Sequence, residues 1–410
     1  MSENPQDIVI CSPLRTPVGA YGGSFTKVPV QELATTVINA IVDATGLTGD
    51  DVDDLILGQA SPNGAAPALG RVVALDSKLG QNVPGLQLDR RCGSGLQAIV
   101  TAAAHVASGA ADIIIAGGAE SMSRTEFTVS GDIRWGVKGG DMQMRDRLAE
   151  ARESAGGVNH PIPGGMIETA ENLRREYGIS REEQDALSTA SQQRWGKAAD
   201  AGLFDAEIVP VTVPAKRRGQ EPTIVSRDEH GRPDTTVEKL AALRPIMGRQ
   251  DAEATVTAGN ASGQNDGAAA VVVTTRAKAA EKGLTPMMRL VSWSVAAVPP
   301  ETMGIGPVPA TKKALERARL TLDDMGSIEL NEAFAAQALS VLREWGISWE
   351  DERLNPLGSG ISMGHPVGAT GARMVVTLAH RMQREDSQYG LATMCIGGGQ
   401  GLAAIFEKEN

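Results

Sequence analysis

The sequence predicts an α/β fold of two similar halves, with a loop domain inserted in the first. Strand-like apolar runs alternate with segments of helical spacing near both ends of the chain. Glycine-rich helix starts occur at Cys92 and at His365, and a strand ending in glycines follows each of them. The alternation of strands and helices also predicts a mostly parallel sheet.

The first half is expected to run strand, helix, strand, helix, strand. The apolar run at 7–17 is typical of a buried strand that ends in proline-containing loop chemistry, and 30–46 has helical spacing with a glycine stop. A short strand is predicted at 52–60. Residues 92–110 then form a helix opened by glycines, and 111–123 form a strand that ends in Gly-Gly.

The middle of the chain is richer in charge, Gly and Pro and is predicted to be an inserted loop domain. It contains one clear helix at 180–202, with Ser180 as a candidate N-cap. Long excursions of this kind are often functional. The predicted division is a first half of 1–120 plus 256–276, a loop domain of 121–255 and a second half of 277–410.

The second half repeats the alternation. A Gly/Ala/Asn loop and strand are expected at 255–275, and 309–346 predicts helix, strand, loop and helix. A glycine-rich loop opens a helix within 355–382. Residues 389–407 predict a strand, a glycine-rich turn and a last strand.

Composition and charge exclude several classes of function. The 410 residues carry a formal net charge of −11 without a dominant basic run, which argues against nucleic-acid and membrane partners. The three cysteines are far apart and form no C-x-x-C pair, so neither a disulfide framework nor a metal site is predicted. The N-terminus lacks a signal-peptide pattern, and no apolar run reaches about 18 residues. We expect a cytoplasmic protein.

Cys92 is the first candidate for chemistry. It opens the stretch "CGSGLQAI" at a predicted helix N-terminus, where the helix dipole is expected to lower the pKa of a thiol. The neighbouring glycines leave backbone N–H groups free to bind an oxyanion. The alternative is a small buried apolar residue, the usual role of an unpaired cysteine.

His365 lies in "SMGHPVGATG" and is the natural base for such a thiol. Pro366 suits the first turn of a helix, and the glycines around it clear side chains from the imidazole. The alternative is a loop histidine with a purely structural hydrogen bond.

Cys395 ends a strand directly before the glycines of "CIGGGQG". A thiol, with an ordinary pKa of about 8.5, can move a proton to or from carbon near neutral pH. Gly397 is the best-placed glycine to supply a backbone N–H donor. The alternative for Cys395 is a residue of the strand core.

Three further features are ambiguous on residue type alone. Asn331, in "ELNEAFAAQAL", is either a helix N-cap or a group that holds a water or a carbonyl oxygen. The loop at 257–270 is a generic turn-rich segment or a weak phosphate cradle. Arg232 is expected to be a solvated loop arginine.

These stretches together resemble the thiolase family. The matching segments occur in the family's order and extend over nearly the whole chain: "CGSGLQAI", "GGAESMS", "TAGNASGQNDGAAA", "MGIGPVPA", "NEAFA", "NPLGSGISMGHPVGATGAR" and "CIGGGQG". The resemblance implies a five-layered αβαβα thiolase fold. It also implies acyl transfer between coenzyme A (CoA) thioesters in fatty acid and lipid metabolism, with CoA as substrate or product and no tightly bound cofactor.

The resemblance assigns a role to each candidate. Cys92 is the nucleophile that becomes acylated, His365 activates it, and Cys395 gives or takes the proton at carbon. Asn331 holds a water that forms one oxyanion hole with His365, and the backbone N–H groups of Cys92 and Gly397 form the second. The enzyme would condense two acetyl-CoA to acetoacetyl-CoA, or cleave 3-oxoacyl-CoA with CoA.

The resemblance also implies where CoA and the acyl group bind. Arg232 falls near the nucleotide phosphates and Ser262 at the pantetheine. Met166 and Met303 fall at the acyl tunnel, and their alternative is packing in the core. The residues expected to bind CoA or substrate are Arg232, Ser262, Met166, Ala258, Gly259, Met303, Ala333, Phe334 and Met247.

The chain departs from the family pattern at Gly165, Ile167, Met247 and Ser359. These departures leave the catalytic residues intact and put the acyl chain length in doubt. The segment 131–142 falls where family members carry a loop used in assembly, so a homodimer or homotetramer is expected.

Two other kinds of protein are alternatives to a thiolase. A ketosynthase-like condensing enzyme of the same superfamily needs no second cysteine, so Cys395 argues against it. A non-catalytic scaffold with the thiolase fold would not need Cys92, His365 and Cys395 together.

Overall fold

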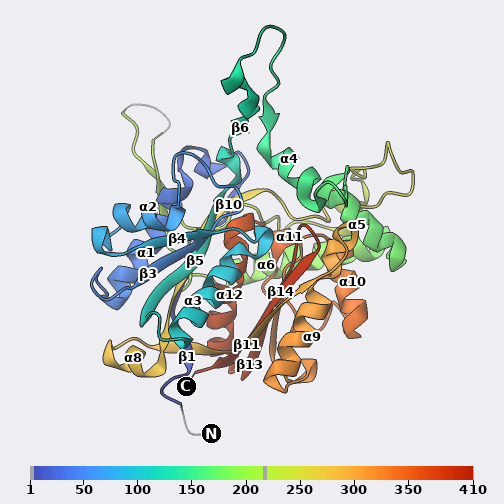
Figure 1. Ribbon diagram of the computed structural model, residues 1–410. Helices are drawn as coiled ribbons and strands as arrows, with labels where there is room; N and C mark the ends of the chain where they lie inside the picture. Colours follow the sequence, from blue (N-terminus) through green and yellow to red (C-terminus); the bar gives the residue numbers. More distant parts are fainter. Residues whose placement is uncertain (1–3, 216–218, 410) are drawn as a thin grey trace.

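A ten-stranded sheet runs through the computed structural model, which describes residues 4–215 and 219–409 (Figure 1). Met1 and Asn410, the outer bounds of the two predicted halves, lie outside the described residues. A short strand, β2 (Gly19–Ala20), pairs beside β10. From edge to edge the other strands are β12 (Ser327–Leu330), β13 (Tyr389–Ile396), β14 (Gln400–Lys408), β11 (Pro286–Ala297), β1 (Ile8–Arg15), β10 (Asn265–Thr275), β5 (Ile113–Ser121), β3 (Asp54–Gly58) and β4 (Gly85–Leu88).

The prediction of a mostly parallel sheet is wrong. Only β3–β4, β3–β5 and β12–β13 are parallel pairs among the named strands, and the centre of the sheet is antiparallel. The reason is topological. β1 takes an antiparallel neighbour on each side, and a tight turn at 397–399 joins β13 to β14 as a hairpin.

Two helices, α3 (Ser94–Ala107) and α12 (Val367–Glu385), fill the space between the two halves of the sheet. Their apolar side chains share one core with side chains of β3, β5 and β10 on one side and of β13 and β14 on the other. A Cβ added to Gly95 would lie 2.7 Å from the backbone nitrogen of Ala372, and one added to Gly371 would lie 2.5 Å from that of Leu96. Glycine at both positions therefore permits the close approach of the two helices.

The outer faces of the sheet are covered by further helices. In the first half α1 (Val30–Thr45) and α2 (Leu69–Asp76) pack on β3 and β5, and in the second half α9 (Pro307–Ala318) and α10 (Ala335–Trp345) pack on β12, β13 and β14. The layers are thus helices, sheet, central helix pair, sheet and helices. This order is the predicted five-layered αβαβα arrangement.

Side-chain alternation explains how one strand serves two layers. In β5, Ile114 faces the central helices whereas Ile113 and Ile115 face the outer ones. In β14, Phe406 faces inward and Ile405 outward. Successive side chains of a strand point to opposite faces, so strands with both faces covered are apolar throughout.

The segment between β5 and β10 forms the excursion that the composition indicated. Ser180 caps α6 in a capping box with Glu183, which confirms the predicted N-cap. Figure 1 shows the part around β6 projecting away from the layered body. The elements here are β6 (Phe127–Thr128), β7 (Arg145–Asp146), α4 (Arg147–Glu153), α5 (Gly165–Glu176), α6 (Arg181–Asp200), β8 (Val211–Val213), β9 (Thr223–Val225) and α7 (Val237–Ala241); α8 (Arg276–Glu281) and α11 (Gly360–Met363) lie further along the chain.

A buried arginine ties this segment to the first strand. Arg15, at the end of β1, is fully buried and donates from Nε to Glu207 at 2.6 Å. It also makes a bidentate pair with Asp228, at 2.7 and 3.1 Å. Two buried carboxylates from the inserted segment are therefore neutralised by one cation of the sheet.

Over residues 4–215 and 219–409, no helix has the length and apolar character to cross a membrane.

We expect Arg15→Leu to lower the free energy of unfolding by about 3–5 kcal/mol, because it leaves Glu207 and Asp228 buried without their cation. Urea denaturation followed by circular dichroism measures the change. The control is Lys78→Ala, which breaks a half-exposed pair with Asp43 and should cost less than about 1 kcal/mol. An Arg15→Leu protein as stable as this control would contradict the stabilising role of Arg15 between Glu207 and Asp228.

Candidate active site

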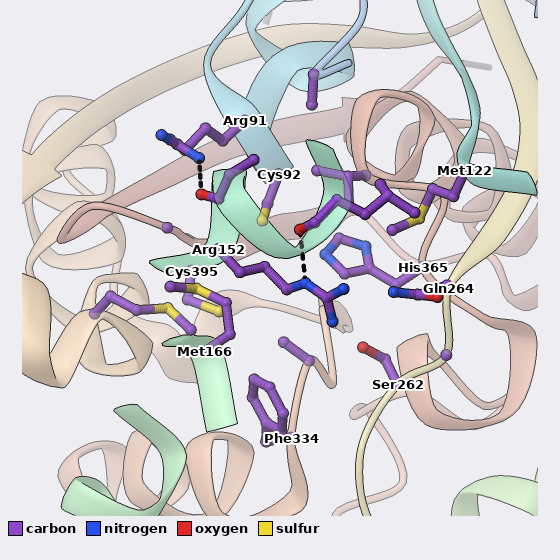
Figure 2. A pocket seen from close by; sticks show the side chains of 18 of the residues that line it. Arg91, Cys92, Met122, Arg152, Met166, Ser262, Gln264, Phe334, His365 and Cys395 are labelled. Atoms are coloured by element: carbon purple, nitrogen blue, oxygen red, sulfur yellow. Dashed lines mark hydrogen bonds between the residues drawn. The ribbon is translucent and has the colours of Figure 1, made fainter. Parts of the chain in front are cut away.

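The three predicted reactive side chains converge on one cavity of about 180 Å³, shown in Figure 2. Cys92 comes from the start of α3, His365 from the start of α12 and Cys395 from the end of β13. The cavity is lined by Ala60, Ser61, Arg91, Cys92, Met122, Leu148, Ala151, Arg152, Met166, Ile167, Ser262, Gly263, Gln264, Met303, Ala333, Phe334, His365, Val367, Cys395 and Gly397.

Cys92 sits in a single 3-10 turn, Arg91–Gly93, that leads directly into α3. The turn is held by Ser94, whose hydroxyl accepts from the Arg90 N–H at 2.8 Å and donates to the Arg91 carbonyl at 2.7 Å. A Cβ at Gly93 would lie 2.5 Å from Ile396, so the turn also packs closely on the end of β13. These contacts fix the direction in which the Cys92 thiol points.

The predicted lowering of the Cys92 pKa is wrong for the free enzyme. Burial raises the pKa of the thiol, and this effect exceeds the opposing effects of the Gly397 backbone N–H and the Arg91 charge. Cys92 thus rests as a thiol. The Gly397 N–H nevertheless favours the thiolate form of Cys92, so a donor is in place for the charge that forms when the thiol loses its proton.

Two hydrogen bonds orient His365. Its backbone N–H donates to the Asn265 side-chain oxygen at 2.9 Å, and its Nδ1 lies 2.7 Å from the Thr370 hydroxyl. The single hydroxyl proton of Thr370 is already donated to the Pro366 carbonyl at 2.9 Å. Thr370 must therefore accept from Nδ1–H, and this assigns the lone pair of the neutral imidazole to Nε2.

The imidazole is neutral at physiological pH. Burial, together with the nearby Arg373 charge, lowers the pKa of His365 to about 4. A neutral imidazole with a free lone pair can take the proton of a thiol, and it becomes a donor once it has done so. The resting site is accordingly an uncharged thiol–imidazole pair.

A buried carboxyl tethers the helix that follows His365. Glu120, at the end of β5, accepts from the backbone N–H groups of Ala60 and Gly368 at 2.9 Å each. Burial raises the pKa of Glu120 to about 7. The first turn of α12 is thereby fixed to two segments of the first half.

Cys395 lies across the cavity as the second thiol. It is fully buried, and its wall is apolar, with Met303, Ala333 and Phe334 in one cluster. Burial raises the pKa of the Cys395 thiol strongly, and the neighbouring Cys92 adds to the effect. Cys395 is therefore protonated at rest, the form suited to donate a proton to a carbanion.

Asn331 is not an N-cap, because α10 begins at Ala335 with Phe334 in the cap position. The Asn331 side chain is fully buried, and neither amide atom has a hydrogen-bond partner among the described residues. A Cβ at Gly360 would lie 2.7 Å from its oxygen. A buried amide without protein partners is available to bind a water or a substrate oxygen.

The predicted CoA and acyl contacts divide into two groups. Met166, Ser262, Met303, Ala333 and Phe334 line the cavity. The others do not belong to its lining, as far as the described residues define it: Arg232, which is exposed, Met247, Ala258 and Gly259, together with the catalytic candidate Asn331.

Several residues of the site were not singled out from the sequence. Asn265 and Thr370 position His365, and both lie inside the stretches that carry the resemblance. Arg91, Arg152 and Gln264 also line the cavity. The arginine next to Cys92 was visible in the sequence, whereas nothing in the pattern around Arg152 indicated that it faces the nucleophile.

Over the described ranges, no group of three His, Cys, Asp or Glu residues could hold a metal ion.

A nucleophilic thiol beside a neutral imidazole and a backbone donor is the arrangement of enzymes that transfer acyl groups through a thioester. The family models for the thiolase N-terminal and C-terminal domains match residues 8–277 and 284–408. The chain thus belongs to the thiolase family, and it is an acyl-CoA C-acyltransferase.

Individual proteins similar to this chain support the same family. The chain is 46% identical over 406 residues to the beta-ketothiolase BktB of Cupriavidus necator, covering 98% of this chain and 99% of that protein. The crystal structure of Bacillus anthracis acetyl-CoA acetyltransferase matches with a TM-score of 0.92 at 41% identity, over 98% of this chain and 99% of that one. Human mitochondrial 3-ketoacyl-CoA thiolase in complex with CoA matches with a TM-score of 0.91 at 37% identity, over 99% and 98%.

The low pKa of His365 gives a pH prediction. We expect the rate constant for acetylation of Cys92 by acetyl-CoA to fall by less than about twofold between about pH 7.5 and about pH 5.5, because His365 stays neutral. An imidazole with its ordinary pKa of about 6.5 would lose about tenfold over this range. Quench-flow mass spectrometry measures the rate constant.

The control is Glu120→Gln, which removes a carboxyl that titrates in the same range but keeps an oxygen to accept from Ala60 and Gly368. A tenfold loss in both proteins would show that His365 titrates near its ordinary pKa.

Proposed function

We propose that Cys92 carries the acyl group, with His365 as its base and Cys395 as the acid or base at carbon. The observation that carries the proposal is the meeting of two thiols and one neutral imidazole in a single cavity, whose wall also includes Gly397. The reaction is the cleavage of a 3-oxoacyl-CoA by CoA, or its reverse, the condensation of two acetyl-CoA to acetoacetyl-CoA.

In the cleavage direction, Cys92 attacks the 3-oxo carbon and its proton passes to Nε2 of His365. The bond between C2 and C3 breaks, its electron pair remains on C2, and the Cys395 thiol donates a proton there to release acetyl-CoA. The acyl group stays on the Cys92 sulfur. The CoA thiol then attacks this thioester, its proton returns to Cys395, and His365 gives its proton back to Cys92.

Two oxyanion holes serve these steps. The backbone N–H groups of Cys92 and Gly397 stabilise one oxygen, and His365 with a water on Asn331 stabilises the other. The unpartnered, buried amide of Asn331 supports the second assignment. Removal of one such donor typically costs about 10²–10³ in rate.

CoA is proposed to be the substrate and product, with the loop domain of 121–255 as its main binding surface between the halves of 1–120 plus 256–276 and 277–410. Ser262, Met166, Met303, Ala333 and Phe334 line the route to Cys92, which supports contacts with the pantetheine and acyl group. Arg232 is exposed, as a residue that meets the distant nucleotide phosphates would be.

We further infer a cytoplasmic homo-oligomer, a dimer or tetramer, that acts in fatty acid and lipid metabolism. Seven large apolar side chains lie exposed on the segment that projects from the body in Figure 1, which supports contact with a second copy there. They are Phe127, Val129, Ile133, Trp135, Val137, Met142 and Met144.

The nucleophile is tested with Cys92→Ser. We expect the wild-type protein to gain one acyl group on Cys92 when it is mixed with acetyl-CoA, and the variant to gain none, because a hydroxyl is a far weaker nucleophile than a thiol here. Intact-mass and peptide mass spectrometry measure this. Absence of an acyl group in the wild type, together with no cleavage of acetoacetyl-CoA, would revive the scaffold alternative.

Cys395→Ser separates proton transfer from acylation. We expect this variant to acquire the acetyl group on Cys92 but to cleave acetoacetyl-CoA about 10²- to 10⁴-fold more slowly, since only the second process needs a proton at carbon. The loss of acetoacetyl-CoA absorbance and the acyl mass are measured on the same preparation. Equal loss of both activities would contradict the role of Cys395.

A further inference from the structure

The wall of the active-site cavity carries two positive charges and no negative one. Arg91 and Arg152 both line it, and none of the lining residues is Asp or Glu. Figure 2 shows the Arg152 side chain extending across the cavity between Cys92 and Phe334. An uncompensated cation in a substrate cavity favours an anionic group in the ligand.

Arg152 has only neutral partners. Its Nε donates to the Leu148 carbonyl at 2.8 Å, within the same helix, α4. The side-chain oxygen of Gln264 faces Arg152 and accepts from its guanidinium at 2.8 and 3.3 Å. No carboxylate forms an ion pair with Arg152 in the part of the chain that the structure describes.

Arg152 lies beside the first residue of α5. Gly165, at the start of α5, adopts a left-handed conformation with φ of 60°. A Cβ there would lie 3.4 Å from Cβ of Arg152, an ordinary van der Waals distance, so the start of α5 lies directly beside the end of α4. Gln264 lies in an isolated bridge with His365, so the guanidinium is held at the catalytic end of the cavity.

The charge at this end matches the acyl group better than it matches CoA. The pantetheine arm and the thioester are uncharged, and the phosphates of CoA lie at the far end of that arm. Arg91 lies beside the Cys92 thiol and is tied to the Ala151 carbonyl at 2.9 Å, so its charge acts mainly on the nucleophile. Arg152 is left as the cation that can meet a charged substituent.

We propose that Arg152 is a specificity-determining residue that binds a carboxylate at the distal end of the acyl chain. The preferred substrates are then 3-oxoacyl-CoA esters whose acyl group ends in a carboxylate rather than a methyl group. This inference rests on the proposed function, since it names the substrate class of the same site.

The test compares two substrates of equal carbon number, 3-oxohexanedioyl-CoA and 3-oxohexanoyl-CoA. We expect the wild-type protein to have the higher kcat/KM for the carboxylate ester. Arg152→Gln should lower the ratio of the two kcat/KM values by no more than about tenfold, because Arg152 is exposed and solvent weakens its ion pair with the substrate. Arg152→Lys keeps the charge and should recover part of the ratio.

The matched control is Arg145→Gln, on the same segment but outside the cavity, where Arg145 pairs with Glu150 at 3.0 Å. Its ratio should equal that of the wild type. Each variant is checked for folding by its thermal unfolding curve. The acyl mass on Cys92 after treatment with acetyl-CoA is measured in parallel.

Two outcomes would overturn the proposal. The wild type could favour the methyl-ended ester, or Arg152→Gln could leave the ratio of the two kcat/KM values unchanged. In the second case, an equal loss of both values with a raised KM for CoA would place the guanidinium on CoA. In each case a wild-type protein that still acylates Cys92 leaves the proposed function intact. A wild type that neither acylates nor cleaves either ester would refute the proposed function itself.

Discussion

The close approach of α3 and α12 is the constraint on which the site depends. The two helices meet where neither has a side chain to keep them apart, at Gly95 and Gly371, and Gly118 of β5 comes equally close to the backbone of Gly368. Because contact occurs near the N-terminal ends of both helices, the residues just before them, Cys92 and His365, are brought to the same cavity. A pair of core glycines thereby sets catalytic geometry.

Burial at this contact shifts the pKa of the two thiols and the pKa of the imidazole in opposite directions. It raises the pKa of both thiols and lowers that of the imidazole, so Cys92, His365 and Cys395 all rest uncharged. Charge appears only when a substrate carbonyl accepts the Cys92 sulfur, at which point the Gly397 N–H and the neighbouring Arg91 stabilise it. Donors that are already in place when charge develops lower the barrier without reorganisation.

The sequence was most informative where local rules decide the structure. The alternation of strands and helices predicted the elements, Ser180 was visible as a cap, and the glycine settings of Cys92 and His365 marked both as candidates. Strand direction was not accessible, because the pairing of β1 with β10 and β11 is set by contacts between distant segments. The predicted direction of the Cys92 pKa shift was wrong for a related reason. A helix N-terminus is a local feature, whereas burial depends on the whole fold.

Side-chain direction was the other missing information. Thr370 is five residues from His365, and only the turn that begins α12 places its hydroxyl on Nδ1. Arg152 lies in a charged stretch that resembles a solvated helix face, and the fold turns it into the cavity beside Gln264. Neither residue type nor spacing carries such an orientation, since it depends on how α12 and α4 are placed in the whole fold.

The residues that line the cavity come from two parts of the chain, one that carries the reacting groups and one that can set substrate selectivity. Cys92, His365 and Cys395 stand at the ends of elements of the layered body, each fixed by packing and hydrogen bonds of that body. Met166 and Arg152 come instead from the inserted segment, which covers the cavity from the other side. Rigid elements hold reacting groups precisely enough for proton transfer, while a segment outside the body can change its side chains without disturbing them. The departures at Gly165, Ile167 and Met247 all fall in that segment, which is where a difference in acyl preference would be encoded.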